Sequence, residues 1–187
     1  LAITEANLGI NQANFFITRN VHHKLKVFKQ DHLLATTLLT YNNLSPQDAW
    51  PAGAYKNYIR FTLPPKASLE QVLVDQQPLP SNQIDLASTS DASVIGFLVT
   101  IPIQTQTTIE VSYRLADSFS FDRNRTFYSL FIPKQPGTNS DPLTVNLILP
   151  PYFGLLDSFP QREPVPGGVT FLTDLSTDRL FTLSLEK

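Results

Sequence analysis

Apolar side chains alternate with polar ones in two long runs of this chain, and this alternation restricts the possible folds more than any other feature. The alternating apolar residues are Ile95, Phe97, Val99 and Ile101 in the first run and Ile109, Val111, Tyr113 and Leu115 in the second. Because successive side chains of a β-strand point to opposite faces, a period of two predicts strands with one buried face. We therefore expect strands at residues 95–101 and 109–115.

Similar runs recur along the chain, and turn residues separate them. The expected strands span residues 22–29, 32–42, 55–63, 69–76, 95–101, 109–115, 126–132, 143–149, 169–173 and 179–185. Helical periodicity is almost absent, and most of the 15 prolines stand at strand ends, where proline opposes helix formation and edge growth. The pattern predicts an all-β fold: an antiparallel β-sandwich, Ig-like or jelly-roll-like, with about ten strands and little or no helix.

The sequence also predicts two hairpins. The first two expected strands form one about residues 30–31, and the last two strands close the chain as the other. The residues expected to face one another across the first hairpin are Leu25 and Val27 on one arm and Leu34 and Thr36 on the other.

The chain is long enough for one large all-β domain or two small ones. A division near residues 117–125 would leave about four strands in the second part, with no disulfide or metal to hold so small a core. We therefore expect one compound β-sandwich domain at residues 20–187. Residues 1–19 are expected to be an N-terminal linker or a packed extension, because Asn7, Gly9, Asn11 and Asn14 interrupt their apolar residues.

Charge is nearly balanced, with 14 basic and 16 acidic residues and a formal net charge of -2. This balance gives no support to nucleic-acid binding. Arg19, Lys24, Lys26 and Lys29 make one stretch modestly basic, which indicates a solvated strand face or, alternatively, an anion-binding patch. No apolar run reaches the roughly 18 residues that a spanning helix needs, so we expect no direct membrane insertion by this chain.

No motif for catalysis or for a cofactor stands out. The sequence contains no cysteine, no nucleophile elbow, no phosphate-binding loop and no paired-histidine zinc motif. His22 and His23 are neighbours, so on a strand they point to opposite faces, and His32 lies at the turn of the expected hairpin. We therefore expect no bound metal, no cofactor and no enzymatic activity.

One group of residues could bind a ligand or form a structural corner: Trp50, Tyr55, Lys56, Tyr58 and Arg60. Flat aromatic faces beside basic and amide side chains suit stacking on sugar rings. In the alternative, Trp50 and Tyr55 pack inward and close one end of the sandwich. The sequence favours the corner, because Trp50 stands in a tight turn containing proline and glycine, where an aromatic side chain tends to be buried.

Three separated segments resemble a known family. They read EANLGINQANFFITR at residues 5–19, WPAGAYKNYIR at residues 50–60 and KQPG at residues 134–137. Together with the strand spacing between them, they resemble the C-terminal β-rich extracellular region of a family of bacterial membrane-anchored surface proteins of unknown function. The segment that begins at Trp50 is the most specific. Gln12 and Ala52 depart from the family, in which Lys and Gly are common at these positions.

The resemblance implies a β-rich domain outside the cell, anchored through a membrane segment outside this chain, and it implies no catalytic or ligand residues. We therefore expect a non-catalytic extracellular structural or adhesive module of a bacterial cell-surface protein. The alternative is a carbohydrate-binding module for envelope polysaccharide. The expected partner is a protein or a polysaccharide at the cell surface, and the chain is expected to be a monomer.

Overall fold

The computed structural model describes residues 1–27, 33–116, 119, 122–162 and 167–187. These ranges form fourteen strands and no α-helix, with short 3-10 turns at Ala13–Phe16 and Ser81–Gln83. The fold is all-β, with mainly antiparallel sheets packed as a sandwich, which confirms the predicted class. The Ig-like or jelly-roll type stays a prediction. Within the described ranges, no helix is long and apolar enough to cross a membrane.

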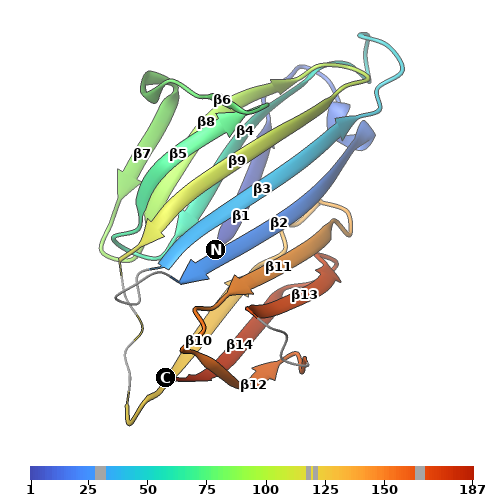
Figure 1. The fold of residues 1–187 in the computed structure, drawn as a ribbon. Coiled ribbons are helices and arrows are strands. Elements are labelled where there is room, and N and C mark those ends of the chain that lie inside the picture. Colours follow the sequence, from blue (N-terminus) through green and yellow to red (C-terminus); the bar gives the residue numbers. More distant parts are fainter. Residues whose placement is uncertain (28–32, 117–118, 120–121, 163–166) are drawn as a thin grey trace.

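One layer of the sandwich is a seven-stranded sheet (Figure 1). Its strands, in spatial order, are β13 (Gly168–Asp174), β11 (Pro142–Ile148), β2 (Ile17–Val27), β3 (Leu33–Asn43), β9 (Gln106–Leu115), β5 (Ser68–Val74) and β6 (Gln77–Pro78). Neighbouring strands are antiparallel, except that β11 and β2 run parallel.

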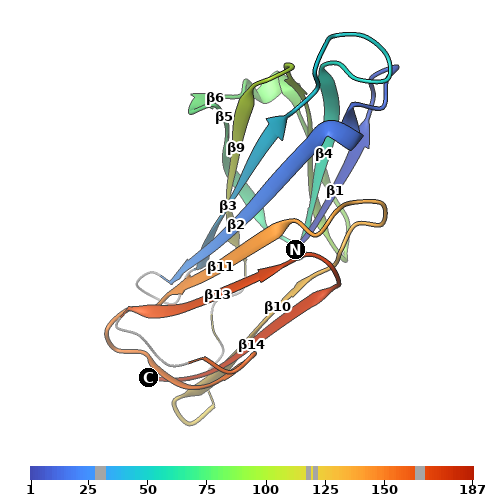
Figure 2. The same ribbon diagram turned by 90° about the vertical axis from the view of Figure 1, so that its right-hand side faces the viewer.

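The opposite layer consists of two smaller sheets. The four-stranded sheet has the order β1 (Ala2–Asn7), β4 (Tyr55–Leu63), β8 (Ser93–Ile101) and β7 (Ile84–Ser88). The three-stranded sheet has the order β10 (Arg125–Ile132), β14 (Arg179–Glu186) and β12 (Gly154–Phe159). In Figure 2, β1 and β4 lie beside β2 and β3, while β10 and β14 lie below β11 and β13. Each smaller sheet therefore covers one half of the seven-stranded sheet.

Hydrogen bonds join the two smaller sheets where β1 meets β10. The amino group of Leu1 donates to the carbonyl oxygen of Phe131 at 3.0 Å. The side-chain amide of Gln135 accepts from the Glu5 N–H at 2.8 Å and donates to the Glu5 carbonyl oxygen at 2.9 Å. Gln135 therefore satisfies the backbone edge of β1 as a neighbouring strand would.

Inward-facing rows of apolar residues form one core cluster that runs through both halves of the sandwich. The predicted rows on β4, β8, β11 and β14 are confirmed, because alternate residues of these strands are buried. On β9, Ile109, Val111 and Tyr113 are buried and Leu115 packs against the same core. Burying one side chain of this size contributes about 1.5 to 3 kcal/mol, so these rows are the main source of stability.

The hairpin predicted from the first two expected strands is present as β2 and β3, but the predicted register is wrong by one residue. Leu25 lies opposite Ala35, whereas Leu34 and Thr36, its predicted neighbours, are on the outer face of the sheet. Since the side-chain period is two, a shift of one residue exchanges the two faces of a strand. The predicted turn at residues 30–31 lies outside the described residues.

The predicted final hairpin is wrong. β13 pairs with β11 in the seven-stranded sheet, whereas β14 pairs with β10 and β12 in the opposite layer. The chain therefore crosses the core between these two strands. Phe171 of β13 and Phe181 of β14 meet inside the sandwich, with their ring centroids 4.9 Å apart.

The structure has more strands than the sequence predicted, because β1, β6, β7 and β12 are short or polar. The segment expected to be a linker or a packed extension contains β1, which pairs with β4 from Ala2 opposite Thr62 to Asn7 opposite Asn57. This pairing makes the N-terminal residues part of the sandwich. The domain division at residues 1–19 and 20–187 stays a prediction.

Candidate functional site

Five large apolar side chains are exposed at one end of the sandwich, and we call this set the apolar end. They are Leu8, Ile10, Phe15, Leu44 and Trp50, with exposed fractions between 58% and 101%. They belong to two loops, residues 8–16 before β2 and residues 44–54 before β4. Figures 1 and 2 both show these loops projecting together at the end of the molecule away from β12. Clustered exposed apolar side chains commonly mark an interaction surface.

Hydrogen bonds between backbone groups tie the two loops to each other and to the strands. They run from the N–H of Leu8 to the carbonyl oxygen of Lys56 (2.7 Å), from Gln12 to Pro51 (2.8 Å) and from Leu44 to Phe16 (2.8 Å). In addition, the side-chain amide of Asn11 donates to the carbonyl oxygen of Ala54 at 3.0 Å. The apolar side chains are therefore presented on loops with defined conformations.

Gly53 anchors the second loop through hydrogen bonds and a close contact with the first loop. Its carbonyl oxygen accepts from the Asn43 side-chain amide at 3.0 Å, and its N–H donates to the Ser45 hydroxyl at 3.2 Å. Its φ is +132°, and a Cβ there would lie 2.8 Å from the Asn11 amide nitrogen. Only glycine combines this conformation with such a close approach.

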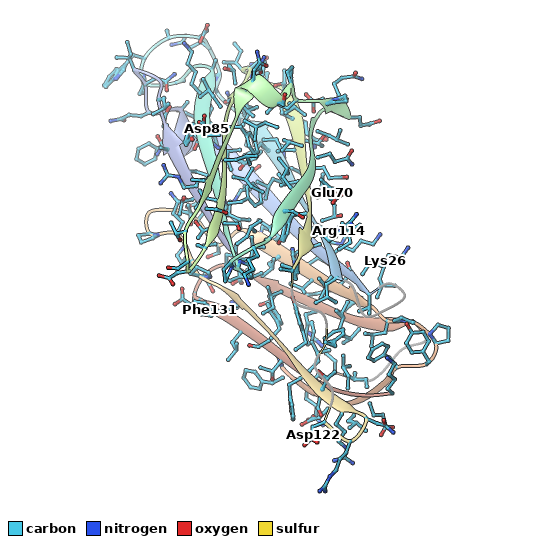
Figure 3. All side chains as sticks on the ribbon, turned by 90° about the vertical axis from the view of Figure 1, so that its left-hand side faces the viewer. Lys26, Glu70, Asp85, Arg114, Asp122 and Phe131 are labelled. Carbon is cyan, nitrogen blue, oxygen red and sulfur yellow. The ribbon has the colours of Figure 1, made fainter. Side chains whose placement is uncertain are left out.

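The apolar end contains almost no charge. Residues 8–18 and 44–54 include one charged side chain, Asp48, whereas charged residues make up 16% of the whole chain. An Asp48 carboxylate oxygen accepts from the Ala54 N–H at 3.1 Å. Figure 3 shows Lys26, Glu70 and Arg114 along the side of the sandwich and Asp122 at its opposite end. The two loops therefore carry little charge themselves, and the exposed Lys56 of β4 adjoins them at Leu8.

The structure separates the two aromatic residues that the sequence placed together in a corner. Tyr55 is buried, with 4% of its surface exposed, as the structural interpretation requires. Trp50 is 72% exposed, so the prediction that it packs inward and closes the sandwich is wrong. The turn that contains Pro51 and Gly53 directs the indole toward solvent. A flat row of Trp50 and Tyr55 rings for sugar stacking is not formed either.

Lys56, Tyr58 and Arg60 lie on the outer face of β4, as the alternation predicted. The Tyr58 ring crosses the neighbouring strand at Gly96, where a Cβ would lie 2.3 Å from the tyrosine oxygen. Its hydroxyl donates to Asp85 on β7 at 2.7 Å, and the Arg60 guanidinium lies 5.8 Å from the ring centre. These contacts hold Tyr58 flat against the sheet and away from the apolar end.

A buried charged cluster, Glu5, Arg19 and Asp141, lies inside the sandwich. The side chains of these three residues are all less than 10% exposed. The Arg19 guanidinium donates to a Glu5 oxygen and, from its Nη2 atom at 2.6 Å, to Asp141. The expectation that Arg19 is part of a solvated or anion-binding face is wrong, because Arg19 is buried between two carboxylates. Lys24 is exposed on the outer face of β2, and Lys29 lies outside the described residues.

Further hydrogen-bond donors to the Glu5 carboxylate come from β3 and β4. Tyr41 donates to Glu5 at 2.7 Å, Asn57 at 3.1 Å and Tyr55 at 3.3 Å. Burial opposes the charge of Arg19, but attraction to Glu5 and its acidic neighbours outweighs it and raises the pKa of Arg19 above its ordinary value. Burial and then the charge of Glu5 raise the pKa of Tyr41 well above its ordinary value.

The three segments that carry the family resemblance meet at this charged cluster. Glu5 and Arg19 come from the first, Tyr55 and Asn57 from the second, and Gln135, which bonds the Glu5 backbone, from the third. A cavity of about 70 Å³ adjoins the cluster. Because its carboxylates and guanidinium are paired with one another, the cluster is suited to holding these segments together.

The two histidines within the described residues, His22 and His23, point to opposite faces of β2. His23 is buried, with its Nδ1 atom 3.0 Å from the Thr37 hydroxyl, whereas His22 is exposed beside Asn146. His32 lies outside the described residues. In the part of the chain that the structure describes, no three of histidine, cysteine, aspartate and glutamate gather as metal ligands.

Lowering the pH from 7 to 5 is expected to reduce the free energy of unfolding by about 2 kcal/mol through His23 alone. Burial, followed by repulsion from the amino group of Leu1 and from His22, lowers the pKa of His23 to about 3. In the unfolded chain this pKa is near 6.5. The unfolded state therefore binds a proton that the folded state excludes, and stability is lost as the pH falls from 6.5 toward 3.

Urea midpoints at pH 7 and pH 5 check this expectation. His23→Gln should remove this component of the pH dependence, while His22→Gln, the exposed neighbour, should keep it. Equal pH dependence in wild type and His23→Gln would contradict the assignment.

Replacing Trp50 with alanine is expected to change the free energy of unfolding by less than about 1 kcal/mol, because the ring is mostly solvated. Urea unfolding followed by circular dichroism measures the difference between wild type and variant. A loss of about 3 to 5 kcal/mol, the cost of removing a buried tryptophan, would show instead that the ring is packed inside.

A larger hollow of about 1050 Å³ lies near the other end of the molecule. Its walls include Pro64, Leu115, Tyr128 and Arg125. The neighbouring residues 117–118 and 120–121 lie outside the described ranges. We therefore place the candidate site at the apolar end, where the described residues form the whole surface.

No family model and no curated protein matches the sequence. The fold is similar to that of a Legionella pneumophila protein for which nutrient binding has been proposed, with a TM-score of 0.53 at 9% identity over 100% of this chain and 70% of that one. Aminopeptidase A of L. pneumophila has a TM-score of 0.47 at 14% identity, over 98% of this chain and 23% of the enzyme. Leukotriene A4 hydrolase of Saccharomyces cerevisiae has a TM-score of 0.49 at 8% identity, over 93% and 30%.

At these identities the first likeness shows the fold alone. The chain spans less than a third of either enzyme, and both enzymes have TM-scores below 0.5, so no argument about activity follows from them.

Proposed function

We propose that this chain is a non-catalytic structural or adhesive module of an extracellular bacterial cell-surface protein, and that it attaches through its apolar end. The membrane segment that anchors the parent protein lies outside this chain in this proposal. The single observation that supports it best is the group of five exposed apolar side chains on two hydrogen-bonded loops.

The charged cluster supports a non-catalytic role. Glu5, Arg19 and Asp141 are buried and joined by ion pairs through Arg19, and Tyr41 and Asn57 donate hydrogen bonds to the Glu5 carboxylate. A catalytic acid or base needs access to the substrate proton, whereas a paired and hydrogen-bonded carboxylate is suited to a structural role.

Carbohydrate binding remains the second candidate function, because Trp50 is exposed beside the polar side chains of its loop. The burial of Tyr41 and Tyr55 leaves Trp50 without these partners for a stacking row. A glycan array on the purified chain tests this candidate. Specific binding to one glycan class that Trp50→Ala abolishes would place it ahead of the adhesive role.

Attachment of coated beads to isolated bacterial envelope fragments tests the proposed function. Beads that carry the wild-type chain are expected to attach, and beads that carry the I10S/F15S/W50S variant should attach no better than uncoated beads. The matched control is F127S/F159S/L172S, which replaces three exposed apolar residues outside the apolar end. Both variants need wild-type circular dichroism spectra before the comparison.

Attachment that both variants lose, or that both keep, would contradict a role for the apolar end. Absence of attachment by the wild-type chain would contradict the adhesive function itself.

A further inference from the structure

We infer that the apolar end binds the interfacial region of a lipid bilayer and needs no anionic lipid to do so. The inference rests on the proposed function, because it names the surface to which the apolar end attaches. It is carried by the side-chain types at this end and by the near absence of charge in the two loops.

The exposed side chains have the composition that suits a bilayer interface. Trp50 and Phe15 are large aromatic residues, and Ile10, Leu8 and Leu44 add aliphatic surface around them. Tryptophan favours the headgroup region, and apolar side chains inserted about 5 to 10 Å deep contact the acyl chains. The two loops project from the end of the sandwich, so these five side chains can enter the interface while the strands stay outside (Figures 1 and 2).

Part of the loop backbone, mainly where the loops meet the strands and each other, is hydrogen-bonded within the protein. The N–H groups that donate to protein acceptors are those of Leu8, Gly9, Gln12, Ala13, Phe15, Leu44, Ser45, Gly53 and Ala54. An unpaired backbone group is costly in lipid, where no water replaces its partner. The paired groups therefore lower the cost of bringing these loops into the headgroup region, where water still reaches the other backbone groups.

The charge of the apolar end complements an uncharged surface. Asp48 is the one charged residue in residues 8–18 and 44–54, and its carboxylate accepts from the Ala54 N–H. Attraction to anionic lipid depends on clustered lysine and arginine near the membrane. Lys24 and Lys26 lie toward the other end of β2, so Lys56, which adjoins Leu8, has no basic cluster from β2 beside it. Binding should therefore depend on apolar contact and change little with salt.

This inference differs from the sequence-based expectation of no direct membrane insertion. That expectation follows from the absence of an apolar run long enough to span a bilayer. Insertion of loop tips into one leaflet needs no spanning run, because five side chains from two separate loops supply the apolar surface.

Trp50 is the only tryptophan of the chain and therefore reports on this end alone. The purified chain is mixed with vesicles of pure phosphatidylcholine, and the emission of Trp50 is followed in 0.1 M and 1 M NaCl. We expect a blue shift and quenching by bromine-labelled acyl chains, with less than a twofold change in vesicle affinity between the two salt concentrations.

The variant I10S/F15S retains Trp50 and removes two of the most exposed apolar side chains of this end. It should bind phosphatidylcholine vesicles at least tenfold more weakly than wild type. The matched variant F127S/L172S should bind like wild type. Circular dichroism and urea midpoints establish that both variants are folded.

No change of Trp50 emission with phosphatidylcholine vesicles would overturn the inference, as would binding that requires anionic lipid and disappears at 1 M NaCl. If envelope attachment of the beads still depends on the apolar end in that case, the proposed function stands and its partner is a protein or a polysaccharide. If envelope attachment also fails, the proposed function fails with the inference.

Discussion

Replacing Arg19 with methionine is expected to lower the free energy of unfolding by about 3 to 5 kcal/mol. Arg19 is the cation between Glu5 and Asp141, and the side chains of both carboxylates are less than 10% exposed. Its removal leaves two buried negative charges without a partner, which costs more than the loss of an ordinary hydrogen bond. Urea unfolding followed by circular dichroism measures the loss.

Arg114→Met is the matched control, because Arg114 pairs with Glu70 on the exposed side of the sandwich (Figure 3). Its substitution should cost less than about 1 kcal/mol. Adding Glu5→Gln to Arg19→Met should recover part of the stability, since it removes one of the unpaired charges. If Arg19→Met is no more damaging than Arg114→Met, the structural role of the charged cluster is wrong.

Replacing Phe171 with alanine is expected to cost about 3 to 5 kcal/mol and to lower the unfolding midpoint at the far end of the molecule as well. Phe171 is 1% exposed and packs on Phe181 across the core. Since one core cluster runs through both halves, loss of this contact should destabilise the whole sandwich. Trp50 fluorescence and far-UV circular dichroism should therefore report the same reduced midpoint.

Leu172→Ala provides the control, because Leu172 is the next residue of the same strand and points outward. It should leave the midpoint within about 0.5 kcal/mol of wild type. A Trp50 transition that stays at the wild-type midpoint while circular dichroism shows an earlier partial loss would indicate two independently folding units.

The local periodicity of the sequence was sufficient to predict individual strands and their buried faces. Ile59 and Phe61 on β4, and Val99 on β8, point inward as their spacing predicts. The register of β2 and β3 was not predictable in the same way. Both alternating rows of β3 contain apolar residues, Leu33 on the inner face and Leu34 on the outer face, so the pattern does not distinguish the two faces.

The pairing of strands with partners elsewhere in the chain could not be predicted from the local periodicity of the sequence. β13 and β14 are close in sequence and look like a hairpin, yet they lie in opposite layers because each pairs with strands elsewhere in the chain. The parallel pairing of β11 with β2 joins residues such as Val145 and His23, which no turn connects. Such choices depend on the fit of the complete core rather than on any one segment.

The candidate site was likewise predictable from the sequence only in part. The near absence of charge in residues 8–18 and 44–54 is visible in the sequence and is the signal that could have indicated the apolar end. The direction of Trp50 was mispredicted, because the composition of a turn does not define which way a side chain points. The partner of Arg19 was equally hidden, since Asp141 lies 122 residues further along the chain.

The most direct test of attachment through the apolar end is the solvent accessibility of residue 50 in the free and attached chain. Biosynthetic replacement of Trp50 by 5-hydroxytryptophan allows its emission to be excited apart from that of envelope proteins. Acrylamide should quench this emission readily in the free chain, because the ring is 72% exposed, and much more weakly once the chain is attached to envelope fragments. Equal quenching in the free and attached chain would contradict the account.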